Sequence, residues 1–341
     1  MKRILLATSA LCVGAGMAVA EITLSGDAEM GVAGSKDDST RFHTDVNVKF
    51  TLSGETDGGI AFGSAIELAE SGDGSKAVDD DDEHGGISIF MKGPFGNLEM
   101  GDTDGAFDWA LAETNGVGGG SIADNEEHGA FTGNGGLDGM HDGQILRYDY
   151  SFGGFGFGAS VELDDKIAGK DPAQDDDGKP VFGVGGRYSM GMADGISVGV
   201  GAGFQMGSTA THDKTIIGGS VDIGTAYGLK AIANFSSESH ETRAEDNDDE
   251  ATIARAGLGL GYAAGPFEIG VNVGATENDM PGANDDSDVS GVGLAASYDL
   301  GGGAKVKFGV GSDETDWPEV EGRDSRDTDG NSWSLGVAFS F

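Results

Sequence analysis

Large apolar side chains alternate with small or polar ones, one residue at a time, in segment after segment of this chain. Residues 333–341, for example, have the sequence WSLGVAFSF, in which every second side chain is large and apolar. A period of two matches a β-strand whose two faces differ, and it does not match a helix, whose period is 3.6 residues. The chain is therefore predicted to be all-β, with strands that each have one apolar and one polar face.

Sixteen such segments follow one another, and most have nine to twelve residues. A tilted strand of about this length crosses the apolar layer of a bilayer. No segment after residue 20 reaches the roughly 18 consecutive apolar residues that a membrane-spanning helix needs. The predicted strands are 22–33, 43–54, 59–70, 85–93, 96–103, 144–152, 155–164, 181–190, 195–206, 214–223, 227–237, 252–263, 266–276, 289–299, 303–313 and 332–341.

The connections between these strands alternate between long and short. A soluble sandwich gives no reason for this asymmetry, whereas an outer-membrane barrel has short turns on its periplasmic side and long loops outside. We therefore expect a sixteen-stranded antiparallel up-and-down transmembrane β-barrel. The long connections are 34–42, 71–84, 104–143, 165–180, 207–213, 238–251, 277–288 and 314–331.

The second face of the strands distinguishes a packed core from a lumen that contains water. It consists of glycine, serine, threonine and alanine together with charged side chains, which are unfavourable in a core and ordinary in water. A barrel of sixteen strands is wide enough for an aqueous channel. A solvated sheet of a soluble protein is the alternative. The charged members of this face are Asp27, Glu29, Lys49, Glu67, Arg147, Glu162, Arg187, Lys230, Arg255, Glu268, Lys305 and Lys307.

The first twenty residues differ from the rest. Two basic residues precede an apolar stretch, and Ala18-Val19-Ala20 forms a small-residue cleavage site. These features predict a secretory signal peptide at 1–20, cleaved after Ala20, and a barrel domain at 21–341. An anchoring helix is the alternative, although the stretch is short for one. Cys12 is the only cysteine of the sequence and would leave with the signal peptide, so no disulfide is expected.

Acidic side chains dominate the composition. Without Lys2 and Arg3 of the signal peptide, the chain has 18 basic and 59 acidic side chains, and thus a net charge of −41 at neutral pH. This charge argues against a nucleic acid as partner. For a channel, it predicts a raised cation concentration at the mouth and mild cation selectivity at low salt.

The connection 104–143 is about forty residues long and contains no clear strand. Long ordered loops are usually functional, and one that folds into the barrel would narrow the pore. Residues 107–111, FDWAL, are expected to form a short helix with its apolar side against the wall. A disordered surface loop is the alternative.

Carboxylates of this loop could face basic side chains of the wall and create a transverse electric field across a constriction. The candidates on the loop side are Asp104, Asp108, Glu113, Asp124, Glu126 and Glu127, and those on the wall are Lys49, Arg147 and Arg187.

The sequence contains little that supports nucleotide binding or catalysis. Glycine-rich stretches such as 199–203 lack the lysine and following helix of a phosphate-binding loop, and no nucleophile–base set indicates an enzyme.

Acidic runs such as Asp79–Glu83 and Glu245–Glu250 could bind calcium or simply be hydrated. A secreted calcium-binding β protein rich in glycine and aspartate, of the adhesin or surface-layer type, is the second functional hypothesis. It requires tandem G-G-x-G-x-D repeats, and none is found in register.

Several short motifs resemble one family of membrane proteins. They are LSGDAEMGV at 24–32, FTLSGETDG at 50–58, GNLEMGD at 96–102, GLAASYDLGGGA at 293–304 and the terminal Phe341. Together they resemble the alphaproteobacterial general diffusion porins of the Rhodobacter type, over the whole chain after residue 20.

The resemblance implies a homotrimeric outer-membrane barrel for passive diffusion of small hydrophilic solutes, with no required cofactor and with calcium in acidic loops as an option. It also implies that the third long loop, 104–143, narrows the pore. The terminal aromatic strand, ending at Phe341, would be the signal for the barrel assembly machinery. We expect the trimer contact at 22–33 and 59–70, with 332–341 beside the first.

Overall fold

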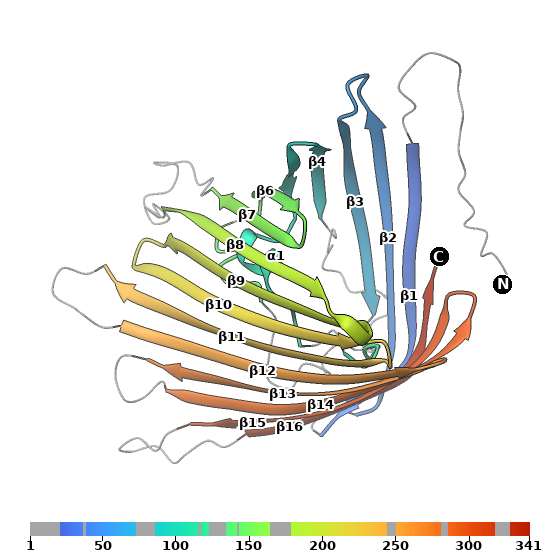
Figure 1. Ribbon diagram of the computed structural model, residues 1–341. Helices are drawn as coiled ribbons and strands as arrows, with labels where there is room; N and C mark the ends of the chain where they lie inside the picture. The colour runs from blue at the N-terminus through green and yellow to red at the C-terminus, as the bar shows by residue number, and fades with distance from the viewer. Residues whose placement is uncertain are drawn as a thin grey trace.

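The computed structural model describes residues 21–36, 39–72, 86–114, 117–122, 134–141, 143–163, 179–243, 250–280, 286–317 and 328–341. Sixteen strands form one closed antiparallel barrel in which each strand pairs with its neighbours in the sequence and the last pairs with the first (Figure 1). The sixteen-stranded up-and-down barrel is thereby confirmed. Among the described residues, no helix is long and apolar enough to cross a membrane.

The strands are β1 (Glu21–Ser35), β2 (Arg41–Glu55), β3 (Ala61–Gly72), β4 (Ile87–Gly93), β5 (Gly96–Gly101), β6 (Ile145–Phe152), β7 (Phe155–Glu162), β8 (Lys179–Gly191), β9 (Ile196–Ser208), β10 (His212–Thr225), β11 (Leu229–Thr242), β12 (Glu250–Ala264), β13 (Phe267–Asp279), β14 (Ser287–Gly301), β15 (Ala304–Asp316) and β16 (Thr328–Ser340). Within the described ranges, two short helices accompany them, α1 (Ala106–Ala110) and the 3-10 helix η1 (Ala193–Gly195).

All sixteen predicted strands exist, but most of the long strands extend further at the loop end than the alternation indicates. One prediction is wrong as a result. Residues 207–213 were expected to be a long loop, yet Gly207 pairs with Lys214 and only 209–211 remain between β9 and β10. Backbone pairing determines where a strand ends, and a glycine or threonine that breaks the apolar alternation can still donate and accept in the ladder.

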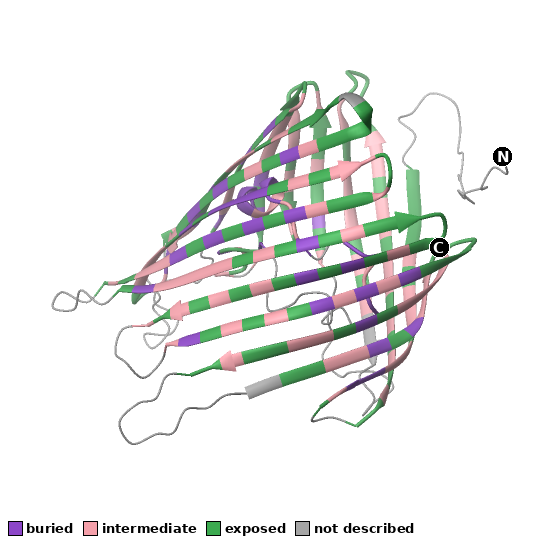
Figure 2. Ribbon diagram, turned by 60° about the horizontal axis from the view of Figure 1, so that its bottom comes forward, coloured by how far each residue is buried: buried purple, intermediate pink, exposed green. Residues whose placement is uncertain are grey.

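The register assigns each side chain to a face. Ile22 and Leu24 are 62% and 63% exposed on the outer face, whereas Lys49 pairs with Glu67 on the other face. The bands of differing burial along each strand in Figure 2 follow this alternation. All twelve charged residues predicted to face the lumen share one parity through the continuous register.

Aromatic side chains gather at the end of the barrel where the short turns lie. Phe152 and Phe155 flank one turn with ring centroids 5.7 Å apart, and Phe155 contacts Tyr188 at 4.3 Å. Phe267 and Tyr298 form a similar pair at 4.6 Å. A ring of aromatics at this level is typical of the bilayer interface around a membrane barrel.

The final strand closes the barrel. It pairs with β1 from Ser340 opposite Asp27 to Ser332 opposite Ser35. Leu335 is 47% exposed on the outside, whereas its neighbour Ser334 is fully buried. Closure leaves no unpaired strand edge, which a bilayer would not tolerate.

Candidate functional site

The described residues between β5 and β6 lie along the inner wall, where Figure 1 draws α1 within the barrel. The amide of Ala106 donates to Ser160 Oγ of β7 at 2.9 Å, and the amide of Ala112 donates to Ser220 Oγ of β10 at 2.8 Å. Ser160 and Ser220 have the same parity as the charged face. These bonds therefore place the loop in the lumen.

Helix α1 has only five residues and no side-chain cap at its N-terminus. A helix of that length is not stable by itself in water, so tertiary contacts hold it. Phe107 is fully buried and anchors an apolar cluster between the loop and the wall. The other members are Leu111 and Leu137 of the loop and Val181 and Ile216 of the wall.

Glycines on the inner face of β8, β9 and β10 allow α1 to approach the wall. A Cβ atom at Gly203 or at Gly218 would lie 2.7 Å from the ring of Phe107. At Gly185 and Gly201, a Cβ atom would collide with backbone oxygens of the helix. The absence of side chains at these four positions therefore sets the distance between helix and wall.

Beyond α1 the loop continues around the wall towards the seam of the barrel. Residues 117–118 lie against glycines of β12 and β13. Ile122 lies over the closing pair of strands, where a Cβ atom at Gly31 of β1 or at Gly336 of β16 would collide with its Cδ1 atom. The described residues of the loop thus contact strands from β6 through β16 to β1.

A lysine of β15 ties the loop to this seam. Lys307 Nζ donates to the carbonyl oxygen of Ser121 at 3.2 Å and to Glu29 Oε1 at 2.7 Å. The Lys307 and Glu29 side chains are only 17% and 11% exposed. A loop carbonyl is thereby joined to an ion pair that bridges β15 and β1.

The returning limb, residues 134–141, is held by two buried polar side chains of the wall. Gln205 accepts a backbone amide of the limb at 2.8 Å and donates to the carboxylate of Asp138. Glu162, which is 2% exposed, accepts three backbone amides between residues 139 and 143 at 2.8–3.1 Å. Each of these bonds satisfies a group that would otherwise be costly to bury.

Negative charge accumulates where the two limbs of the loop meet. Burial, and after it the neighbouring charges of Asp104, Glu113 and Asp138, raise the pKa of Asp108 to about 7, while Arg147 opposes them. Asp108 is therefore only partly ionised at neutral pH. Its protonation changes the charge of the loop.

Two comparisons with known proteins agree on the nature of this barrel. A model of the Gram-negative porin family matches residues 7–318. The chain is also similar to a porin of Rhodobacter capsulatus, with 29% identity over 320 residues that cover 86% of this chain and 95% of the relative.

The chain belongs to the Gram-negative porin family.

Solved structures support the same fold. A crystallographically refined porin aligns with a TM-score of 0.67 at 24% identity and covers 94% of this chain and all of its own. A porin of Comamonas acidovorans, described as anion-selective, aligns with a TM-score of 0.63 at 15% identity over 94% of this chain and all of its own. As a member of the Gram-negative porin family, the protein is a channel of the outer membrane, and the hypothesis of a secreted calcium-binding protein is not favoured.

Three of the six predicted acidic residues of the porin's loop lie among the described residues. Asp104 is exposed, Asp108 is on α1, and Glu113 accepts the amide of Asn134 at 3.0 Å. The other three, Asp124, Glu126 and Glu127, lie outside the described residues.

The predicted basic residues of the wall have other partners than the loop carboxylates. Lys49 pairs with Glu67 of the next strand at 3.4 Å. Arg147 donates to the backbone oxygen of Asp104 and pairs with Glu99 at 3.2 Å and with Asp149 at 3.4 Å.

Arg187, like Arg147, binds a backbone oxygen of the loop. Its guanidinium donates to the backbone oxygen of Trp109 at 3.1 Å, and its Cζ atom lies 3.9 Å from the centroid of the Trp109 ring. Arg147 and Arg187 thus contact the backbone of the loop and hold it. Whether the nine predicted residues form the constriction stays a prediction.

The residues that hold the loop were not singled out from the sequence. Glu162 was assigned to the lumen face, but its role in binding backbone amides was not recognised. Gln205, Ser160 and Ser220 were missed altogether, as was Asn234, whose side-chain amide donates to the carbonyl oxygen of Ala112 at 2.9 Å. For Gln205, Ser160 and Ser220 the available signal was a polar side chain with a glycine two residues away on the same lumen-facing side, a place where the wall is open to a close neighbour.

No group of three or more histidine, cysteine, aspartate or glutamate side chains that could hold a metal occurs within the described part of the chain. The acidic runs proposed for calcium, Asp79–Glu83 and most of Glu245–Glu250, lie outside it.

Proposed function

We propose that the third loop is the constriction of this porin, and that small hydrophilic solutes and ions diffuse passively past it. The observation that carries the proposal is the path of the loop, whose described residues follow the inner wall from β6 to β1. Its atoms occupy part of the cross-section that a bare barrel of sixteen strands would leave to water.

We further propose that the channel prefers cations. The basic side chains Lys49 and Arg147 are each paired with carboxylates of neighbouring strands, so they leave little free positive charge to attract anions. The fold itself does not decide whether a porin prefers cations or anions, because a porin with a similar barrel is described as anion-selective. The net charge of −41 after residue 20 favours cations.

Reversal potentials in a KCl gradient across a planar bilayer test the preference. We expect a permeability ratio of potassium to chloride above one in dilute salt. It should approach one in concentrated salt, because the screening length falls from about 10 Å at 0.1 M to about 3 Å at 1 M. A preference for chloride in dilute salt would refute the proposal.

The remaining proposals concern maturation and assembly. The signal peptide would be removed after Ala20, three copies of the mature chain would associate through β1, β3 and β16, and the barrel assembly machinery would bind the terminal strand at Phe341. The aromatic end of that strand is 79% exposed, which leaves it accessible. Calcium in the acidic loops would be detected as a fall in trimer melting temperature after chelation.

A further inference from the structure

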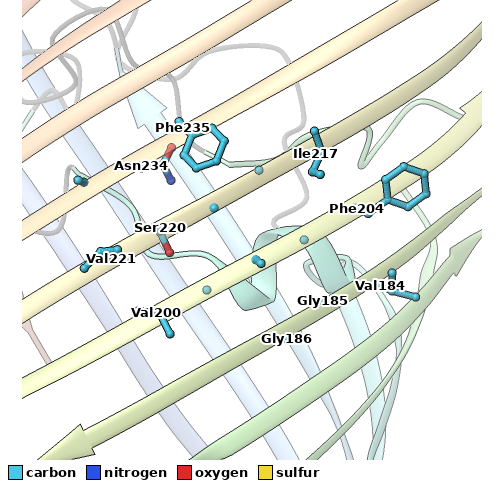
Figure 3. Close-up of a pocket in the computed structure, with 16 residues that line it drawn as sticks. Val184, Gly185, Gly186, Val200, Phe204, Ile217, Ser220, Val221, Asn234 and Phe235 are labelled. Carbon is cyan, nitrogen blue, oxygen red and sulfur yellow. The ribbon is translucent and has the colours of Figure 1, made fainter.

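The wall that contacts α1 on its lumen side has a groove on its outer side. The groove has a volume of about 970 Å³ and lies on the outer face of β8, β9, β10 and β11. In Figure 3, the side chains of Phe204, Ile217 and Phe235 border this groove, and α1 lies behind the strands. Val184, Val200 and Val221 line it as well.

The floor of the groove is a row of small residues. Gly186 of β8 pairs with Ala202 of β9, which pairs with Gly219 of β10. On one side of the floor, displaced from it by two residues in each strand, Val184, Phe204 and Ile217 form a parallel row. The opposite side contains Val200 and Val221, and Phe235 pairs with Gly219 at one end.

Contacts among the described residues explain only part of this floor, since a Cβ atom at Gly219 would lie 3.0 Å from the ring of Phe235. The inner glycines of the same strands are required by α1, but a Cβ atom at Gly186 would meet nothing nearer than the Gly156 backbone oxygen at 3.9 Å. The two polar side chains among the lining residues, Ser220 and Asn234, bond to Ala112 of the loop on the lumen side. The groove is therefore apolar and open to the outside.

We propose that one hydrocarbon chain of a membrane lipid occupies this groove. The groove is continuous with the exposed apolar side chains of the outer surface, which in an outer-membrane porin is the interface with lipid. A trough with a floor one residue wide accommodates a single acyl chain. It does not accommodate a helix, which is about 10–12 Å across with its side chains.

A second copy of the porin is the weaker candidate for occupant. In the closed strand order, β9 is eight neighbours away from β1 in either direction. The groove is thus diametrically opposite the strands expected to form the trimer.

Native mass spectrometry of the full-length porin, purified from outer membranes, tests the proposal. Dipalmitoylphosphatidylcholine is the probe, and dihexanoylphosphatidylcholine has the same headgroup with short chains. We expect one long-chain lipid to be retained per protomer and the short-chain lipid to be lost. Ala202→Phe fills the floor and should lower the retained fraction about tenfold, because even two methylene groups lose their contacts.

Ala296→Phe is the matched control, since Ala296 lies on the outer face of β14 between Ile269 and Phe308. It should leave lipid retention unchanged. Equal loss in both variants, equal retention of the short-chain lipid, or dissociation of the oligomer in Ala202→Phe alone would each overturn the proposal. If Ala202→Phe does not run as a folded barrel on unheated gels, Gly186→Leu replaces it.

Discussion

At the scale of single residues, two half-buried carboxylates of the loop have pKa values raised towards neutrality. The pKa of Asp108 is raised to about 7, and burial likewise raises the pKa of Asp138 to about 6 although Gly105 and Gln205 donate hydrogen bonds to it. A folded-state pKa above the ordinary value means that the protonated form fits the folded loop better. The stabilisation is complete below about pH 4 and is lost as pH rises to about 7.

Hydrogen exchange of the amides at 106–111 should report this loss. We expect their protection factors to fall about tenfold between pH 5 and pH 8, because one pKa unit corresponds to a factor of ten and the partial exposure of Asp108 reduces the effect. Asp108→Asn should remove most of the change. Asp104→Asn should keep it and move its midpoint to lower pH, since the charge of Asp104 contributes to the raised pKa. A profile that Asp108→Asn does not alter would contradict this assignment.

At the scale of elements, α1 depends on the wall more than on its own sequence. The apolar pattern of residues 107–111 predicts a short helix, and the structure places it at Ala106–Ala110. The role of the glycines in the strands that contact α1 is harder to predict from the sequence. Glycines at 185, 201, 203 and 218 look from the sequence like weak strand positions, and their contacts with α1 show why a side chain would not fit there.

Substituting one of these glycines should displace the helix without unfolding the barrel. Gly203→Val would force β-carbon contacts with Phe107, and overpacking of this kind typically costs about 1–3 kcal/mol. We expect a larger or noisier single-channel conductance in planar bilayers. Gly186→Val, on the outer face of the adjoining strand, should conduct like the wild type. If both variants behave alike, the helix does not restrict the pore.

At the scale of the whole molecule, closure of the barrel depends on the last strand. Its end is fixed by two backbone bonds, in which the Phe341 amide donates to Gly26 at 2.8 Å and the Gly26 amide donates to Phe341 at 3.4 Å. These bonds lie beyond the last residue pair of β1 and β16.

Deletion of Phe341 should therefore impair assembly more than transport. We expect a lower yield of heat-modifiable barrel in outer-membrane fractions, and normal conductance for the molecules that do assemble. Phe341→Tyr keeps both backbone bonds and the aromatic ring and should assemble normally. A normal membrane yield of the deletion variant would show that this residue is dispensable.

The sequence by itself determined the number of strands, their two faces and the membrane class, because strand alternation and loop length are local properties that each segment reveals separately. It also located the loop that enters the lumen. The ends of β9 and β10 and the partners of Arg147 and Arg187 were decided by tertiary structure. Arg147 and Arg187 bind backbone oxygens of the loop, and backbone groups carry no sequence signature. The sequence did not show which glycines contact α1, nor that the outer face of the same wall has a groove. Both depend on segments that come together only when the barrel closes.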